Sequence, residues 1–202
     1  MKMSKLEKKF VNSKNRAKKN INLVERLFNQ IDLSNVKKVL EIGCGIGVLT
    51  SYLAGKYRWE IIGIDIDPEQ IEKAKKDNKE NEYLKFFEAD ATNLSFENNE
   101  FDIVLSFNVL HHIPNWDKAL AEIGRILKPA GFYLLSDLRS PEFIARALKD
   151  LLNKYMGVYT LIDIKNNLKV NRLEIIYEEK PKSNIIMRHF SIISKKNLTL
   201  YC

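Results

Sequence analysis

The stretch that decides the fold is Val39-Leu40-Glu41-Ile42-Gly43-Cys44-Gly45-Ile46-Gly47. It starts as an apolar run, passes one acidic residue and then carries three glycines at alternate positions. Glycine has no Cβ, so the backbone can turn tightly at these positions and approach a ligand closely. A buried strand that ends in a glycine-rich turn and opens a helix predicts a nucleotide-cofactor site.

The spacing of the glycines and of two later acidic residues narrows the kind of nucleotide. A dinucleotide-binding fingerprint requires a glycine where this chain has Val48, and no Gly-Lys-Ser/Thr follows as a phosphate-binding loop requires. Asp65 ends the next predicted strand, 18 residues after Gly47, close to the spacing at which an acidic side chain meets ribose hydroxyls. Asp90 ends the third predicted strand, where it can meet a base edge. The pattern favours a nucleoside cofactor without phosphates.

Strand and helix patterns alternate along most of the chain. Apolar runs predict strands over 38–42, 60–65, 83–87, 101–107 and 132–137. Amphipathic spacing predicts helices from Val48 to a stop near Gly55, over 68–78 with Asp67 as N-cap, and over 117–127, where Lys128-Pro129-Ala130-Gly131 stops the helix. This alternation is typical of a parallel sheet with helices on both faces.

The C-terminal part departs from the alternation. We expect a helix over 141–154 and a second helix that begins at Thr160, with Asp163 as its capping-box partner. Two strands follow, over 173–179 and 185–194, joined by the five residues 180–184. So short a connection predicts an antiparallel hairpin.

Composition places the chain among ordinary globular proteins. It has 202 residues, 45% of them hydrophobic and 29% charged, with no uninterrupted apolar run of membrane-spanning length. The two cysteines, Cys44 and Cys202, are far apart and form neither a disulfide framework nor a zinc site. Nor do clustered carboxylates suggest a magnesium site. We therefore expect a cytoplasmic protein without a bound metal.

The net charge of +7 is concentrated at the N-terminus. Residues 1–31 hold nine Lys or Arg and two Glu, so the remaining residues are neutral overall. Apolar residues at helical spacing predict two helices there. We expect a basic helical arm or cap over 1–31, followed by a single domain over 32–202. The arm can attract an anionic membrane surface or RNA, although a solvated helix face is an equally good interpretation.

Taken together, the motifs resemble those of the class I S-adenosylmethionine-dependent methyltransferases, and most closely the small-molecule branch of ubiquinone- and menaquinone-biosynthesis-type enzymes. The resemblance covers residues 36–140 well and the C-terminal part loosely. It rests on the glycine stretch and on later segments: Gly63-Ile64-Asp65-Ile66-Asp67, Ala89-Asp90-Ala91 with Leu94-Ser95-Phe96 and Phe101-Asp102-Ile103-Val104, Leu110-His111-His112-Ile113 and Leu127-Lys128-Pro129-Ala130-Gly131. Such a resemblance implies an α/β, Rossmann-like, seven-stranded sheet, mostly parallel with a C-terminal antiparallel hairpin.

The resemblance also implies roles for individual residues. It implies that the turn of Gly43, Cys44, Gly45 and Gly47 contacts the methionine part of S-adenosylmethionine, and that Glu41 orients this turn. Glu41 can instead be a helix-capping group, and the Cys44 thiol can be a small filler. Asp65 would accept from both ribose hydroxyls, with Ile66 on one adenine face. Asp90 and the N–H of Ala91 would read the adenine edge, and Asn108 would lie beside the methionine amino group or the sulfonium.

Methyl transfer from a sulfonium is an in-line displacement that requires positioning and, for some acceptors, removal of a proton. His111 and His112 follow the fourth predicted strand, and a neutral imidazole is a suitable base. Of the two we prefer His112, and the alternative is that the pair only shapes the loop. After Asn108 neither the motif of base-amine methyltransferases nor a Pro-Cys nucleophile follows.

The sequence therefore predicts an S-adenosylmethionine-dependent methyltransferase with a small-molecule or lipid-like acceptor and with S-adenosylhomocysteine as product. Two alternatives remain open. One is an RNA methyltransferase that uses the basic arm, and the other is a non-catalytic cofactor-binding partner subunit. The identity of the acceptor and the oligomeric state do not follow from the sequence.

Overall fold

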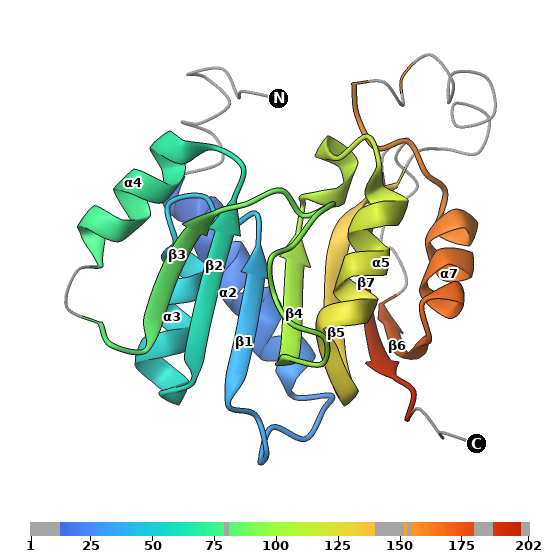
Figure 1. Ribbon diagram of the computed structural model, residues 1–202, viewed down its shortest axis with the longest axis horizontal. Helices are drawn as coiled ribbons and strands as arrows, with labels where there is room; N and C mark the ends of the chain where they lie inside the picture. The colour runs from blue at the N-terminus through green and yellow to red at the C-terminus, as the bar shows by residue number, and fades with distance from the viewer. Residues whose placement is uncertain (1–12, 79–80, 140–151, 153–154, 180–187, 199–202) are drawn as a thin grey trace. The chain divides into compact units, whose positions relative to one another are not determined.

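A computed structural model describes residues 13–78, 81–139, 152, 155–179 and 188–198 (Figure 1). The first helical part of the basic arm, nearly all of the helix expected over 141–154 and the connection over 180–184 lie outside the described residues. The chain forms two compact units, residues 1–90 and residues 91–202, and each is described by itself.

The fold class agrees with the expectation from the sequence. Seven strands form a mixed sheet that is mostly parallel, and its antiparallel pairs involve the C-terminal strand. Among the described residues, none of the helices combines the length and the apolar character that crossing a bilayer requires.

The first unit contains three parallel strands in the order β3-β2-β1. They are β1 (Lys38–Ile42), β2 (Glu60–Asp65) and β3 (Leu84–Glu88). The crossover helix α3 (Val48–Tyr57) follows β1, and α4 (Pro68–Asp77) follows β2. The side chain of Asp67 accepts from the N–H of Glu69, which confirms its role as the N-cap of α4.

The described half of the basic arm is a helix, α2 (Lys14–Phe28), that packs against α3. The Glu25 carboxylate accepts from the hydroxyl groups of Tyr52, at 3.1 Å, and Tyr57, at 3.0 Å, and it pairs with the ammonium group of Lys56. The Phe28 ring makes an edge contact with Tyr57 at 5.7 Å between ring centroids. Polar contacts and an aromatic contact therefore hold this helix against α3 within the first unit.

The second unit contains four strands in the order β4-β5-β7-β6. They are β4 (Phe101–Phe107), β5 (Leu127–Arg139), β6 (Leu173–Glu179) and β7 (Arg188–Lys196). The helices α5 (Trp116–Ile126) and α7 (Leu161–Val170) contact each other, and a short 3-10 helix, η1 (Leu110–His112), follows β4 (Figure 1). Thr160 and Asp163 form the expected capping box at the start of α7.

Several element boundaries differ from the expectation, among them those of β3, α4, α5 and β7, and the differences at α3 and β5 have a clear structural cause. Helix α3 continues through Gly55 to Tyr57, and its C-cap residue, Arg58, has a left-handed φ of 53°. Strand β5 begins at Leu127 rather than Phe132, because Leu127 pairs with Phe101 before the register shifts. The Lys-Pro-Ala-Gly segment is thus an irregularity inside the strand. The start of β5 is set by pairing with β4, which is distant in sequence. The local sequence therefore does not predict this boundary.

Gly63 supplies the space for the ring of Phe86. A Cβ on Gly63 would lie 2.8 Å from two ring atoms of Phe86, which is closer than real Cβ contacts. We expect Gly63→Ala to lower the free energy of unfolding by about 1–3 kcal/mol, the usual cost of overpacking. Urea denaturation measures this change, and the cost should shrink in a Phe86→Leu background.

Gly55→Ala is the matched control, because nothing lies within 4 Å of a Cβ at this helical position. Replacing glycine by alanine inside a helix should stabilise the protein by about 0.5–1 kcal/mol. If Gly63→Ala were as stable as the wild type, the assignment of Gly63 as a space for Phe86 would be wrong.

Candidate functional site

The glycine turn after β1 adopts a backbone conformation that glycine favours. Gly43, Gly45 and Gly47 have φ values of 70°, 55° and 76°, all in the left-handed region that L side chains rarely adopt. Within the turn the N–H of Gly47 donates to the carbonyl of Cys44 at 2.9 Å, and the N–H of Cys44 donates to the carbonyl of Ile64 on β2 at 2.9 Å. Gly47 then caps α3. The three glycines predicted from the sequence therefore form one constrained turn.

The Asp65 carboxylate fastens this turn to the end of β2. Its Oδ2 atom accepts from the N–H of Gly45 at 2.9 Å, and its Oδ1 atom accepts from the N–H of Asp67 at 2.9 Å. Asp65 is 8% exposed. Burial raises its pKa above the ordinary value, while the two N–H donors act in the opposite direction. A carboxylate oxygen has two lone pairs, so both oxygens keep capacity to accept from a ligand hydroxyl.

Glu41 lies buried on β1 and contacts α3. The Thr50 hydroxyl donates to its Oε2 atom at 2.5 Å. Burial raises the pKa of Glu41 to about 7, with a smaller contribution from the nearby Asp65 charge, while the Thr50 hydrogen bond acts in the opposite direction. Because Thr50 lies in the first turn of α3, the contact joins β1 to the start of this helix.

Cys44 is buried in the glycine turn, with its thiol 3.6 Å from the carbonyl of Gly45. Burial, followed by the nearby Glu41 and Asp65 charges, raises the pKa of this thiol. Since the thiolate is the reactive form, the side chain is suited to fill space in the turn and not to act as a nucleophile.

The residues expected at the adenine differ in exposure. Ile66 follows Asp65 and is 53% exposed, so its apolar side chain is available to a planar ligand. Asp90 is exposed, whereas Ala91 is buried. The N–H of Ala89 donates to the carbonyl of Asp65 at 3.1 Å, which fixes the end of β3 beside the end of β2.

In the second unit the end of β5 contacts residues 108–112, which follow β4 and carry His111 and His112. We call these residues the histidine turn. Asp137 is fully buried, and its Oδ2 atom accepts from the N–H groups of Val109, at 3.0 Å, and Leu110, at 2.8 Å. Its Oδ1 atom accepts from the N–H of Leu138 at 2.6 Å and pairs with Nδ1 of His111. A carboxylate on Nδ1 favours the tautomer with a proton there, which leaves Nε2 as the acceptor.

Residues at both ends of this turn are also fixed by backbone contacts, whereas the His112 side chain is exposed. Asn108 follows β4 with a left-handed φ of 59°, and its N–H donates to the carbonyl of Ser136 at 2.7 Å. The His112 side chain is exposed, with its ring centroid 4.0 Å from that of His111. The N–H of Gly157 donates to the carbonyl of His111 at 3.0 Å, and a Cβ on Gly157 would lie 2.4 Å from the carbonyl oxygen of Leu110. Gly157 therefore packs directly on the histidine turn.

Sequence reasoning missed Asp137 and Gly157. Asp137 had a recognisable signal, because it is an acidic residue near the end of an apolar strand, as Asp65 is. Gly157 had none, since its packing partner is a turn more than 40 residues away in sequence. In the part of the chain that the structure describes, no group of three or more His, Cys, Asp or Glu residues is arranged to hold a metal ion.

Comparison with known proteins finds one matching family model and several similar proteins. The model of a family described as a methyltransferase domain matches residues 40–135. A phthiotriol/phenolphthiotriol dimycocerosates methyltransferase of Mycobacterium tuberculosis is 34% identical over 161 residues, which cover 75% of this chain and 59% of that protein. A fatty-acid O-methyltransferase of Mycolicibacterium smegmatis is 37% identical over 119 residues, which cover 56% of this chain and 43% of that protein. The chain thus spans about half the length of these relatives.

Among solved structures, geranyl diphosphate C-methyltransferase from Streptomyces coelicolor, in complex with Mg²⁺, geranyl diphosphate and S-adenosyl-L-homocysteine, has a TM-score of 0.72. The match covers 92% of this chain and 83% of that one at 10% identity. At this identity the likeness shows the fold alone.

The buried Glu41 should make stability depend on pH. Because its pKa is raised from 4.5 to about 7, the folded protein keeps a proton that the unfolded chain loses between these values. The contribution is fully present below pH 4.5 and is lost as the pH rises to about 7. We expect this group alone to lower the free energy of unfolding by up to about 3 kcal/mol over that interval. Urea denaturation at pH 5 and pH 8 should show that Glu41→Gln removes this fall.

The control for this measurement is Glu72→Gln, at an exposed position of α4, which should keep the pH dependence of the wild type. A Glu41→Gln protein with the full pH dependence of the wild type would contradict the raised pKa.

Proposed function

We propose that the chain is a class I S-adenosylmethionine-dependent methyltransferase and that it transfers a methyl group from S-adenosylmethionine to a lipid-like small-molecule acceptor. The single observation that carries the cofactor half of this proposal is the buried Asp65 carboxylate, bonded to the N–H of Gly45 in the glycine turn. This geometry holds an acidic group and a left-handed glycine turn together, which suits a ribose and an amino-acid moiety.

In this proposal each residue of the first unit has a defined role. Asp65 accepts from the ribose hydroxyls, and Ile66 covers one face of the adenine. The turn that contains Gly43, Gly45 and Gly47, with Cys44 as its filler, borders the methionine part. Glu41 holds the turn to α3 through Thr50. Asp90 is the acidic group for the adenine edge.

Residues of the second unit supply the remaining roles. The N–H of Ala91 reads the adenine edge, and Asn108 serves the methionine amino group. His111 is the base, because Asp137 fixes its ring and leaves Nε2 able to accept a proton. This differs from the preference for His112 that sequence reasoning gave.

The cofactor supplies, when bound, a methyl group on a positively charged sulfur. Methyl transfer to an acceptor oxygen would require that oxygen to be held opposite the sulfur, so the residues of the protein would contribute mainly orientation. Nε2 of His111 takes the proton that a hydroxyl acceptor loses. A carboxylate acceptor has no such proton, so the His111–Asp137 pair favours a hydroxyl acceptor.

The lipid-like class of acceptor is supported by what the relatives are named for. One acts on phthiotriol and phenolphthiotriol dimycocerosates and another on fatty acids. Because the chain spans only 59% of the first of these, its acceptor is a proposal and does not follow from the match.

Cofactor binding tests the first half of the proposal. Isothermal calorimetry should show that the wild type binds S-adenosylmethionine and S-adenosylhomocysteine. Asp65→Asn should bind about 10–100-fold more weakly, because it removes a charged acceptor of the ribose hydroxyls. The control is Asp77→Asn on α4, an exposed partner of Lys73, which should bind like the wild type. A wild-type protein that binds neither ligand would refute the enzyme proposal.

Transfer of a labelled methyl group tests the second half, with a panel of long-chain alcohols and fatty acids as acceptors. The His111→Asn amide can still donate to Asp137 but cannot act as a base. We expect it to lower kcat for a long-chain alcohol about 10²–10⁴-fold, the usual contribution of a general base.

His112→Asn is the matched control and should lower kcat less than tenfold. If His112→Asn were the more damaging variant, the base would be His112, as the sequence alone suggested. If no lipid in the panel were methylated while the cofactor bound, the acceptor class would be wrong.

A further inference from the structure

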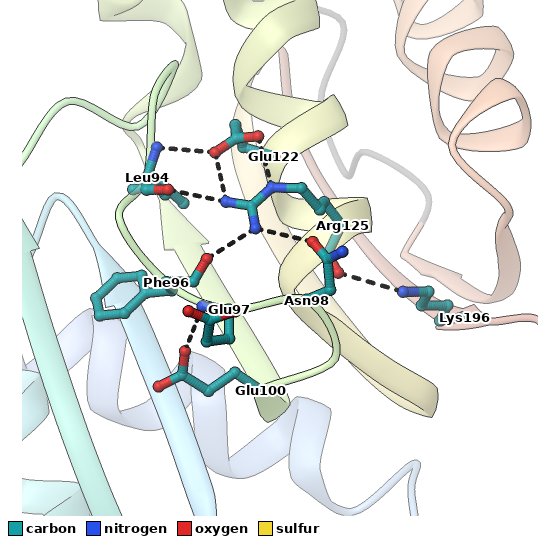
Figure 2. Close-up of polar contacts among 8 residues, drawn as sticks. All are labelled: Leu94, Phe96, Glu97, Asn98, Glu100, Glu122, Arg125 and Lys196. Atoms are coloured by element: carbon teal, nitrogen blue, oxygen red, sulfur yellow. Dashed lines mark hydrogen bonds and ion pairs between the residues drawn. The ribbon is translucent and has the colours of Figure 1, made fainter.

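Residues 89–100 join β3 to β4 without a helix or strand of their own, and one arginine contacts several of them. Arg125 lies in the last turn of α5. Its Nη1 atom donates to the carbonyl of Phe96 at 2.7 Å and to Oδ1 of Asn98 at 3.0 Å, and its Nη2 atom donates to the carbonyl of Leu94 at 2.8 Å. Figure 2 shows the guanidinium group between Glu122 and its three partners in this segment, Leu94, Phe96 and Asn98.

The same guanidinium forms a bidentate pair with Glu122, one turn earlier on α5. Nε and Nη2 of Arg125 donate to the two carboxylate oxygens, each at 2.8 Å. With the three bonds to residues 94–98, all five N–H groups of Arg125 have an acceptor. The pair lowers the pKa of Glu122, since the hydrogen bond from Arg125 favours the charged carboxylate. Lysine cannot reproduce this planar, five-donor arrangement.

Leu94 is held on both sides of its backbone by the pair. Its carbonyl accepts from Arg125, and its N–H donates to Oε2 of Glu122 at 2.8 Å. The Leu94 side chain is buried. Since these contacts are to main-chain atoms, they fix the path of the backbone and not merely a side-chain position (Figure 2).

The far end of the segment is fixed separately. The N–H of Asn99 donates to the carbonyl of Arg125 at 3.1 Å, and the N–H of Glu100 donates to the carbonyl of Ile126 at 2.7 Å. The ammonium group of Lys196 on β7 donates to Oδ1 of Asn99 at 2.9 Å and to the carbonyl of Leu127 at 2.6 Å. The side chains of Arg125 and Glu122 therefore fix residues 94–98, nearer the start of the segment, and other contacts fix its end.

We propose that Arg125 and Glu122 position the adenine-reading N–H of Ala91, three residues before Leu94, and so set the selectivity for adenine. The inference rests on the proposed function, which assigns that N–H to the adenine edge. Arg125 is a positioning residue, because its five donors are occupied by protein acceptors. A segment that is already ordered does not have to be ordered by the ligand, and this preorganisation strengthens binding.

The test compares two ligands that differ at the base edge. S-adenosylhomocysteine has an acceptor at N1 of its base, whereas S-inosylhomocysteine has a donor there, which conflicts with a backbone N–H. We expect the wild type to bind the adenosyl ligand at least tenfold more tightly by calorimetry. In Arg125→Lys and Glu122→Gln this ratio should fall below about threefold, mainly through weaker binding of the adenosyl ligand.

The matched control is Glu178→Gln, which breaks the Lys165–Glu178 pair between α7 and β6 in the same unit. It should keep the ratio of the wild type. Glu122→Gln keeps the test available if Arg125→Lys fails to fold, and circular dichroism verifies folding at the temperature of the titration.

The possible results distinguish a failure of this inference from a failure of the proposed function. If the variants lose thermal stability but keep the ratio of the wild type, the pair is only structural and the inference is wrong. A wild type that binds both ligands equally would also overturn it, while the proposed function would stand. A wild type that binds neither ligand would remove the proposed function and the inference with it.

Discussion

The hydrogen bond from the N–H of Gly45 to the Asp65 carboxylate is the constraint on which the first unit depends. It joins the turn after β1 to the end of β2, and the neighbouring N–H of Asp67 uses the other carboxylate oxygen. The turn can reach Asp65 only because its glycines adopt left-handed backbone conformations. One buried carboxylate thus ties the crossover turn, the strand end and the start of α4 together.

Asp137 does the same for the second unit, at the end of β5. Its carboxylate accepts from three backbone N–H groups and pairs with the His111 ring. The histidine turn therefore depends on a residue that lies 26 positions after His111 in sequence. In both units a buried acidic group at a strand end is satisfied by backbone donors, as buried charges must be. The proposed chemistry uses these two positions because the backbone has already fixed them.

Much of the architecture could be predicted from local patterns. The strands 38–42, 60–65, 101–107 and 173–179 agree with the structure to the residue, because continuous apolar runs and alternation are short-range signals. The extension of β5 back to Leu127 could not be predicted, since pairing with Phe101 decides it. The predicted helix end near Gly55 was also wrong, because a glycine can remain inside a helix at a modest cost in stability.

By itself the sequence determined the fold class, the glycine turn and the acidic residue that meets it, because all three follow from residue type and spacing along the chain. The tertiary structure decided which histidine is held by a carboxylate, where Gly157 packs and how Arg125 organises residues 94–98. These contacts join residues about 26 to 47 positions apart in sequence. No local pattern reports them, because they exist only after strands and helices have packed and buried polar groups have found their partners.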